Sequence, residues 1–558
     1  MSPTHTTGHQ AINQSPAFAG HNAFRSDPLL KDIAADLPRS LRDDFETIGK
    51  FTASAEAQDL ARIANRAIPE LRTHDASGNR IDQVEFHPSW HALMRRSVSI
   101  GLQGSVWEGR REEKGIAHQA RAIRFYLTAG LECGHLCPLT MTSASIAAIM
   151  ASPRIEKSWA PQVVSRRYDS SHRPAMQKSG VTIGMGMTEK QGGTDVRANE
   201  SVAVKAGEGV YSLSGHKWFM SAPMSDAFVM LAQTGAGNSA DQRSGADLSC
   251  FLVPRILEDG TLNGLRLQRL KDKLGNRSNA SSEVEFSDTY GFLLGGEGEG
   301  IRTILDMVTL TRLDCALASA GIMRASLAEA VHHCRHRRVF GQLLIDQPLM
   351  IRVLADLALD VAAATALSLR LARAFDNARD NAAEAAIARL MTPVVKYWVC
   401  KIAPSVIYEI MECMGGNGYV EDRAIARHYR EAPVNAIWEG SGNVMALDVL
   451  RVLTRGKELC DVALESINAD LGAAGPRTVD VLRACMAVAE RDEGAGRLLT
   501  EQLALASAAA ELTRLGAGHV AEAFVETRLG GAWRATYGML DARFDARQII
   551  DMLYPPAS

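Results

Sequence analysis

Two changes of pattern divide this chain of 558 residues. Up to about residue 175, apolar residues recur at spacings of three and four, as in Leu41–Asn65 and Ile116–Leu131, which is typical of amphipathic helices. From Val181 to about Leu294 short β-rich runs replace this spacing, and from Gly300 the chain is rich in Ala, Leu and Arg and helical again. A chain with this order must join a helical domain, a compact β-domain and a second helical part.

The fold class that we expect is therefore α+β, with a central antiparallel β-domain whose strands lie at 210–213, 218–220, 227–233, 248–253 and 283–286. Long helices are predicted at 300–336, 348–378, 382–414 and 442–456, and an extra helical block follows with a break at 472–477. Since this length exceeds a single core, several domains are expected. They are a flexible N-terminal arm (1–30), a helical domain (31–180), the β-domain (181–296), a C-terminal helical domain (297–456) and an extra helical domain (457–558).

Composition and charge are those of an ordinary soluble protein. The net charge is −3, so no basic field of the whole chain points to nucleic acid or membranes. The nine cysteines are scattered and odd in number, which suits reduced thiols better than a disulfide framework. The first 26 residues lack the apolar core of a signal peptide, and no apolar run reaches transmembrane length. We expect a soluble cytoplasmic protein.

The stretch Ile437–Asn443 is the most informative candidate site. Its Glu439 lies between Trp438 and a run of small residues. Small residues let a flat cofactor or a thioester approach the backbone, and an aromatic wall keeps water away. A carboxylate in such a pocket has a raised pKa and can act as a base. The alternative is a solvated surface glutamate, because most glutamates are exposed.

Two glycine-rich stretches could also approach a ligand. Gly184–Val196, at the entry to the β-domain, supplies backbone amides and threonine hydroxyls that could hold a phosphate or the edge of a heterocycle. A plain β-turn is its alternative. Met414–Tyr419 follows a predicted helix and could lie close to a cofactor, or it could simply be a glycine-rich helix end.

Two further stretches carry polar groups at the ends of predicted elements. Gly215–Ser221 is a turn followed by an aromatic strand, and the hydroxyl of Ser221 could reach a ligand, although aromatic strand residues more often belong to a core. Arg335–Gln342 ends a helix. Its arginines could reach a pyrophosphate or could merely complement the helix dipole.

Together and in this order, these segments resemble the acyl-CoA dehydrogenase flavoprotein family. The family patterns Thr-Glu-x-x-x-Gly-Ser-Asp, Trp-Ile-Thr, Arg-x-x-Phe-Gly, Gly-Gly-x-Gly and aromatic-Glu-Gly correspond to residues 188–195, 219–221, 337–341, 415–418 and 438–440. The stretches Met185–Val196, Lys271–Ala280 and Ile437–Asn443, together with the extra C-terminal block, resemble the adaptive-response (alkylation-response) branch, AidB, more closely still.

The resemblance implies FAD as the cofactor. In one subunit the flavin would be bound by Met185, Gly186, Met187, Thr188, Gly193 and Thr194 in the loop, by Phe219, Met220 and Ser221 beside the ring, and by Ile437, Trp438, Gly440, Ser441, Gly442 and Asn443 closing over it. Thr188, Thr194 and Ser221 would also contact the substrate. A neighbouring subunit of a homotetramer would contribute Arg337, Phe340, Gly415, Gly416 and Asn417.

The resemblance also implies a reaction. Glu439 would be the base that removes a proton α to a thioester carbonyl, while a hydride passes from the β carbon to the flavin. Two departures from the family point to weak activity on a small acyl-CoA-like substrate. Trp438 is bulkier than the usual Tyr and could narrow the acyl channel, and Thr309 stands where the family often has an acidic residue.

Resemblance to the adaptive-response branch implies binding of double-stranded DNA through the extra block, with Arg451 and Arg528 as contacts. The charge of the extra block gives little support to DNA binding. Residues 451–558 hold 12 Arg and Lys against 15 Asp and Glu, whereas nucleic-acid binders usually show a basic excess. A basic stripe needs several arginines on one face: Arg451, Arg455, Arg483, Arg528, Arg534 and Arg543. Each could equally be solvated helix surface.

Three interpretations stay open at this point. The first is a DNA-binding flavoprotein of the alkylation response with residual dehydrogenase activity. The second is a working dehydrogenase for short or branched acyl chains without a DNA role, and the third is a flavin-stabilised scaffold without turnover. No metal is expected, because four arginines surround the i, i+4 pair His332 and His336 and oppose a cation.

Overall fold

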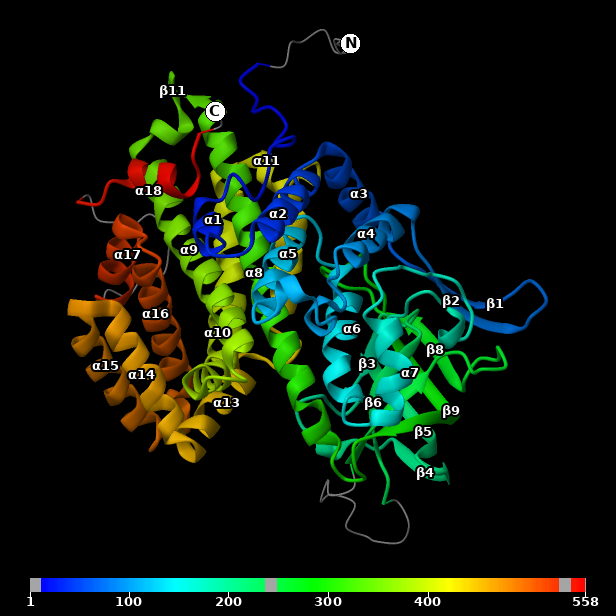
Figure 1. The fold of residues 1–558 in the computed structure, drawn as a ribbon. Coiled ribbons are helices and arrows are strands. Elements are labelled where there is room, and N and C mark those ends of the chain that lie inside the picture. The colour runs from blue at the N-terminus through cyan, green and yellow to red at the C-terminus, as the bar shows by residue number, and fades with distance from the viewer. Residues whose placement is uncertain (1–11, 236–247, 531–542, 557–558) are drawn as a thin grey trace.

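The computed structural model describes residues 12–235, 248–530 and 543–556 (Figure 1). Its N-terminal domain is helical, and the helices are α1 (Pro28–Ile33), α2 (Arg39–Thr52), α3 (Ala55–Arg66), α4 (Pro88–Ser99), α5 (Ala117–Ala129), α6 (Leu136–Ile149) and α7 (Pro153–Val163). The helix predicted at 41–65 is two helices, because Ser54 accepts a hydrogen bond from the Ala57 amide and so starts a new one.

A β-hairpin interrupts this domain where only helix was expected. β1 (Glu70–His74) and β2 (Arg80–Glu85) pair antiparallel, and Gly78 has φ +82° in their turn. Val84 of this hairpin is buried in the core of the β-domain. The hairpin therefore connects the N-terminal helices to the sheet.

The main sheet has seven strands: β3 (Ile183–Gly186), β4 (Val202–Gly207), β5 (Val210–Ser221), β6 (Ala227–Gln233), β7 (Leu248–Pro254), β8 (Leu265–Leu270) and β9 (Ser281–Leu294). The two runs predicted at 210–213 and 218–220 form the single strand β5, which pairs with β3, β4 and β9. The sheet is mixed and not purely antiparallel, because β3 enters from the helical domain and runs parallel to β6.

Long helices follow at nearly the predicted bounds: α8 (Gly300–His336), α9 (Pro348–Asn377), α10 (Ala382–Cys413) and α13 (Gly442–Arg455). Two shorter helices that were not predicted, α11 (Gly416–Tyr419) and α12 (Ala424–Asn435), lie between α10 and α13. A proline occupies the first turn of α9, and Asn381 caps α10 by accepting from two backbone amides. Between α8 and α9 the short strands β10 (Arg338–Val339) and β11 (Gln342–Leu343) form a second hairpin.

The extra block contains α14 (Lys457–Leu471), α15 (Gly475–Ala489), α16 (Gly496–Arg514), α17 (Gly518–Phe524) and α18 (Ala546–Leu553). The predicted break lies between α14 and α15, where a 3₁₀ turn spans Gly472–Ala474. In Figure 1, α14 and α15 lie on one side of α8 and α10, and the β-domain lies on the other.

Apolar cores cover both faces of the sheet. One face packs on α6, α7 and α8 through residues such as Ile183 and Met307, and the other has its own core around Phe228. A larger core unites the helices. A buried ion pair of 2.6 Å joins Arg121 of α5 to Asp314 of α8. This pair fixes α8 to the N-terminal helical domain.

Part of the expected N-terminal arm is packed on the protein. Ser15 is buried and its Oγ lies 3.1 Å from His333 Nδ1. Asn13 hydrogen-bonds the amide and the carbonyl of Arg338 in the second hairpin. From Asn13 onward the segment thus differs from a flexible arm, because its polar side chains find partners on α8 and the hairpin.

Candidate functional site

Glu439 lies in the loop between α12 and α13. Its φ of +57° falls in the left-handed region, which residues with a side chain rarely adopt and which often marks a functional position. Thr311 Oγ1 on α8 donates a hydrogen bond of 2.8 Å to Glu439 Oε2, and Arg312 Nε donates to the Glu439 carbonyl oxygen at 3.2 Å. Two consecutive residues of α8 therefore hold the carboxylate and the backbone of the predicted base.

The surroundings of Glu439 raise its pKa above the ordinary value of a carboxyl group, because burial disfavours the charged form. The hydrogen bond from Thr311 and the positive charges of Arg312 and Lys396 oppose this rise. Lys396 is itself buried and donates to the carbonyl oxygen of Gly440. The result is a carboxylate that binds a proton more readily than one in water, which is what a general base requires.

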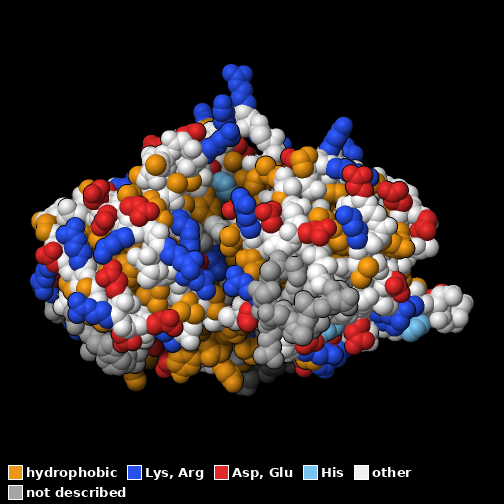
Figure 2. Space-filling model, turned by 90° about the horizontal axis from the view of Figure 1, so that it is seen from below, with side chains coloured by type: hydrophobic (Ala, Val, Ile, Leu, Met, Phe, Trp, Pro, Cys, Tyr) orange, Lys and Arg blue, Asp and Glu red, His pale blue; other side chains and the backbone are white. Residues whose placement is uncertain are grey.

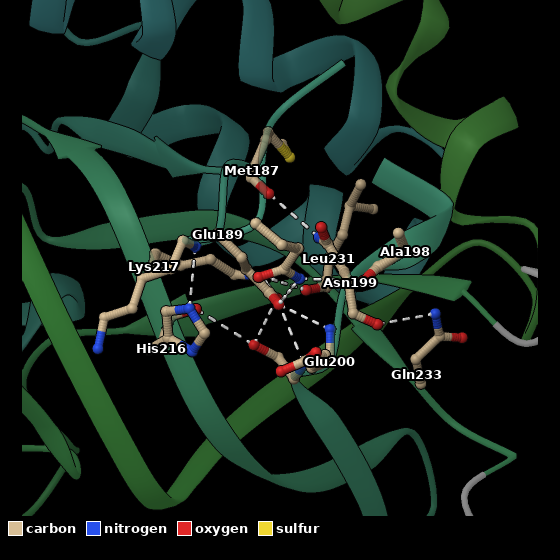
Figure 3. A network of polar contacts seen from close by, with 12 residues as sticks. Met187, Glu189, Ala198, Asn199, Glu200, His216, Lys217, Leu231 and Gln233 are labelled. Atoms are coloured by element: carbon tan, nitrogen blue, oxygen red, sulfur yellow. Dashed lines mark hydrogen bonds and ion pairs between the residues drawn. The ribbon is translucent and has the colours of Figure 1, made fainter. Parts of the chain in front are cut away.

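Glu189 anchors the loop that follows β3 (Figure 3). Lys217 Nζ lies 2.6 Å from Glu189 Oε1, and neither side chain is exposed. Ser201 Oγ donates to the same oxygen, and the Glu200 amide donates to Oε2, each at 2.6 Å. Burial acts to raise the pKa of Glu189, but the charge and hydrogen bond of Lys217, with the other donors, outweigh it and lower the pKa to about 2. An ionised Glu189 thus ties the loop to the sheet.

The tip of this loop is small and exposed. A Cβ at Gly193 would lie 2.3 Å from Thr188 Oγ1, so only glycine fits against that side chain. Gly192 has φ +144° and, like Gly193 and Thr194, is exposed, whereas Thr188 is half-buried. Small residues beside hydroxyl groups fit the edge of a heterocycle or a phosphate.

Strand β5 presents Phe219 and Ser221, but not Met220, to this region. The Phe219 side chain is 52% exposed, whereas Met220 is fully buried in the core on the other side of the sheet, because successive strand residues point to opposite faces. The expectation that the Met220 side chain walls a flavin is therefore wrong. Ser221 is half-buried, and its Oγ lies 3.2 Å from that of Ser281.

Met187 and Trp438 come from two segments that are distant in sequence. Both side chains pack against the apolar core between the sheet, α6 and α8, in which Met185 is buried. Gly186 faces the opposite core, since a Cβ there would lie 3.2 Å from Lys217 Cγ. Trp438 Nε1 is buried and has no hydrogen-bond partner among the described residues.

The residues after Glu439 start α13. Gly440 has φ +103° and Ser441 precedes the first turn. A Cβ at Gly442 would lie 3.3 Å from the Tyr397 ring and 3.4 Å from Lys401 Nζ, so this helix begins close to α10. Ile437 and Asn443 are exposed.

Sequence reasoning missed the residues that support the site. Thr311 and Lys396 hold Glu439 and Gly440 from other helices, and Lys217 holds the loop through Glu189. Lys273 is a further example, because its Nζ donates to the Asn279 carbonyl at 2.6 Å and to Ser281 Oγ at 3.2 Å, next to Ser221. Burial lowers the pKa of Lys273 to about 8. Its signal was the stretch Lys271–Ala280, noted above for its resemblance.

The remaining predicted cofactor residues form a separate group. Arg337 Nη1 donates to Asn13 O at 2.7 Å, and Asn417 lies 3.4 Å from Gln14, so both contact the N-terminal segment. Phe340, at the tip of the second hairpin, is 96% exposed with φ +51°, and Gly415 and Gly416 have open space around them. Thr311 lies in the first third of α8 and Arg337 directly follows its last residue, so the two are about 39 Å apart at 1.5 Å per residue. These residues therefore do not meet Glu439 within one chain.

The two predicted DNA contacts differ in their surroundings. Arg451 is exposed on α13. Arg528 is 9% exposed and forms ion pairs with Asp356 at 2.6 Å and Asp360 at 2.9 Å on α9. Arg528 is therefore a buried structural residue, and its assignment to a DNA face is wrong. Arg534 lies outside the described residues.

Within the parts of the chain that the structure describes, no helix is long and apolar enough to cross a membrane. No group of three or more His, Cys, Asp or Glu side chains gathers there to hold a metal ion. All nine cysteines are free thiols, and eight of them are buried.

The site fits an FAD in three respects. An exposed aromatic ring, Phe219, lies on the strand that ends at Ser221, and the loop tip 192–194 leaves room for a close approach. Trp438 Nε1 is a buried donor without an acceptor, and a flavin offers acceptor atoms. Glu439 lies in the same segment, where a substrate can lie between base and cofactor.

Three family descriptions match consecutive parts of the chain. They are the adaptive response protein AidB N-terminal domain (residues 13–170), the acyl-CoA dehydrogenase middle domain (184–289) and the acyl-CoA dehydrogenase C-terminal domain (298–454).

Individual relatives agree with these matches. The acyl-CoA dehydrogenase-type protein AidB of Escherichia coli K12 is 44% identical over 94% of this chain and 95% of its own length. Acyl-CoA dehydrogenase family member 11 of Caenorhabditis elegans is 33% identical over 78% of this chain and 71% of its own. A Caenorhabditis elegans acyl-CoA dehydrogenase solved in complex with C11-CoA superposes with a TM-score of 0.85 at 26% identity, covering 94% of each chain. The chain belongs to the acyl-CoA dehydrogenase family of FAD-dependent oxidoreductases, in its adaptive-response AidB branch.

Proposed function

We propose that this protein holds FAD, binds double-stranded DNA in the adaptive response to alkylation, and retains a weak acyl-CoA dehydrogenase activity. The observation that carries the enzymatic part is the half-buried Glu439, whose carboxylate accepts a hydrogen bond of 2.8 Å from Thr311 Oγ1. The basic surface beside it carries the DNA part.

In the dehydrogenase reaction, Glu439 takes the proton α to the thioester carbonyl of an acyl-CoA. Its raised pKa favours proton transfer, and Thr311 keeps the accepting oxygen in place. Trp438 and Met187 exclude water from this pocket, which strengthens the electrostatic interactions inside it. Bound FAD supplies the oxidising group for the hydride. The complex of a relative with C11-CoA supports a thioester substrate.

The same proposal includes a homotetramer. Arg337, Phe340 and Gly415–Asn417 face outward far from Glu439 in their own chain, so they can serve a flavin only in a neighbouring subunit. The almost fully exposed Phe340 supports this, because a large apolar side chain at a hairpin tip is costly to leave in water.

Basic side chains gather near the start of α13, although the extra block has no basic excess. Arg497 Nε donates to Tyr397 Oη at 3.2 Å, and Lys401 lies beside Gly442. Arg451 is exposed farther along α13. Figure 2 shows Lys and Arg side chains around a hollow between the C-terminal helices and the β-domain. Phosphate groups are the natural partners of such a surface.

One measurement tests the dehydrogenase activity and another tests DNA binding. Anaerobic titration of the yellow protein with a panel of short and branched acyl-CoAs should bleach the flavin slowly, and a gel shift on duplex DNA should weaken steeply with salt. If the flavin bleaches at the rate of a metabolic dehydrogenase and the protein has no DNA affinity, the second candidate, a working dehydrogenase, would be favoured. The intact Glu439 supports that candidate. DNA affinity without bleaching would leave a flavin-stabilised scaffold.

A further inference from the structure

A cavity of about 780 Å³ lies away from the predicted site. Its walls come from the N-terminal segment, α3, the end of α5, the middle of α8 and the start of α12. None of the residues assigned above to the flavin, the substrate or DNA lines it. Gly321, the lining residue of α8 nearest to Thr311, is about 15 Å farther along that helix. The cavity has the size of a small-molecule pocket.

Arginines dominate the charged groups of this cavity. Seven arginines line it against five carboxylates. Four are paired with a carboxylate: Arg62 with Asp59, Arg324 with Asp27, Arg423 with Glu329 and Arg430 with Glu421. Arg66 and Arg277 are exposed and form no ion pair with any described residue. Their uncompensated positive charge favours an anion and opposes a metal ion.

Four buried nitrogen atoms on residues that line the cavity lack a hydrogen-bond partner in the described part of the chain: His21 Nδ1, Arg324 Nη1, His428 Nε2 and Arg430 Nε. Burial, with nearby positive charge, lowers the pKa of His428 to about 3 and that of His21 to about 4, so both rings are neutral at pH 7. Native structures seldom leave buried polar groups without partners. The unpaired atoms of Arg324 and Arg430 show that the protein does not fully satisfy the guanidinium groups of this wall.

Part of the remaining lining is apolar, and it lies beside polar side chains such as Gln58 and Asn65. This apolar part consists mainly of small side chains, with two aromatic rings: Ala17, Phe18, Ala23, Ala325, Ala328 and Tyr126. A ligand that matches both parts carries a charged head and an apolar body. The two exposed guanidinium groups without an ion pair, Arg66 and Arg277, suit a dianionic head with three acceptor oxygens.

From these observations we infer that the cavity is a second ligand site, which takes a phosphate monoester with an apolar body. The phosphate lies toward Arg66 and Arg277 at the mouth, and the apolar body lies against the alanines of α8. This site is independent of the proposed dehydrogenase and DNA functions, since it shares no residue with them.

The test is isothermal titration calorimetry of the flavin-loaded protein with phenyl phosphate as the probe. We expect saturable binding at one site per chain, no binding of phenol, and weaker binding of benzoate. The double variant Arg66→Ala, Arg277→Ala should raise Kd about tenfold or more, as expected for the loss of two charge-assisted contacts. The control Arg39→Ala removes a guanidinium that is 87% exposed on α2 and outside the cavity, and should leave Kd unchanged.

Several results would overturn the inference. The wild-type protein would show no saturable binding if a second copy of the chain closed the cavity. Equal weakening in Arg39→Ala and in the double variant would mean that phenyl phosphate binds surface charge only, and benzoate binding as tightly as phenyl phosphate would exclude a phosphate site. Loss of flavin from the double variant would assign the cavity to the cofactor. A second variant, Ala328→Phe, should block the probe by filling the cavity, while thermal unfolding confirms that the protein is folded.

Discussion

Lys217 Nζ donates a hydrogen bond of 2.8 Å to the carbonyl oxygen of Leu231. The same ammonium group pairs with Glu189, so one buried side chain joins β5, β6 and the loop that precedes β4 (Figure 3). This arrangement anchors the start of the loop to the sheet at Glu189, while the loop tip at 192–194 stays exposed.

Glu189→Gln should therefore destabilise the protein by about 3–5 kcal/mol, because it leaves the Lys217 charge buried without its partner. Urea unfolding followed by circular dichroism measures this, and absorbance at 450 nm reports any loss of flavin. Lys190→Met is the matched control, since Lys190 is 56% exposed and its nearest carboxylate is 3.9 Å away. A change of under 1 kcal/mol in Glu189→Gln would contradict this account.

The same pair gives a pH dependence of stability. The folded pKa of Glu189, about 2, is below its ordinary value, so ionised Glu189 stabilises the fold fully above that ordinary value of 4.5. This contribution should decrease as the pH falls from 4.5 toward 2. Unfolding curves at pH 7, 4 and 3 should show that the difference between wild type and Glu189→Gln shrinks with acidity.

Thr311→Val should shift the pH profile of flavin reduction. The hydrogen bond from Thr311 lowers the pKa of Glu439, so its removal raises that pKa further. Because the base must be ionised, the acid limb of the rate profile should move to higher pH. Stopped-flow reduction by an acyl-CoA across pH 5–9 measures the limb. Glu439→Gln should abolish reduction with FAD still bound. Thr309→Val is the control and should leave the profile in place, because among the described residues the Thr309 hydroxyl donates to the Leu305 carbonyl on its own helix.

Arg451→Ala and Arg528→Ala should have opposite phenotypes. Arg451 is exposed, so its loss should weaken DNA binding at low salt and reduce the salt slope by about 1 without changing stability. Arg528 is buried between two aspartates, so its loss should destabilise the protein by about 3–5 kcal/mol. Gel shifts across salt and urea unfolding separate the two effects. Normal DNA binding by a folded Arg451→Ala protein would remove α13 from the DNA face.

Phe340→Ala should weaken both flavin retention and assembly, because the proposed neighbour loses the apolar side chain that packs beside its cofactor. Analytical ultracentrifugation and the flavin-to-protein ratio after gel filtration measure the two losses. Arg302→Ala, at the other end of α8 and 83% exposed, is the control. If Phe340→Ala keeps full flavin and the wild-type sedimentation coefficient, the hairpin is not an intersubunit contact.

Local signals in the sequence predicted the long helices well. The predicted bounds of α8, α9, α10 and α13 agree with the structure within one residue, because start signals such as Pro348 in the first turn of α9 and the cap Asn381 of α10 act on neighbouring residues. The β1–β2 hairpin was missed because it sits inside a helical pattern and is mostly polar, and its burial depends on the distant β-domain through Val84.

The candidate site shows the same limit. Glu439 was recognisable from its immediate neighbours, but the residue that holds it, Thr311, lies 128 positions earlier in the chain. Arg528 was misassigned because the aspartates that bury it are on α9, about 170 positions away. Contacts of this kind depend on how the helices pack, which no local pattern records.

The contact of Asn13 with Arg338 has a practical consequence. Both polar ends of the Asn13 amide bind the backbone of the hairpin, so a few residues near the start of the chain brace a segment more than 300 positions later. Proteolytic trimming or an affinity tag at that end would loosen the brace. Preparations with ragged beginnings should then differ in cofactor content from batch to batch, and mass spectrometry of the intact chain would reveal the reason.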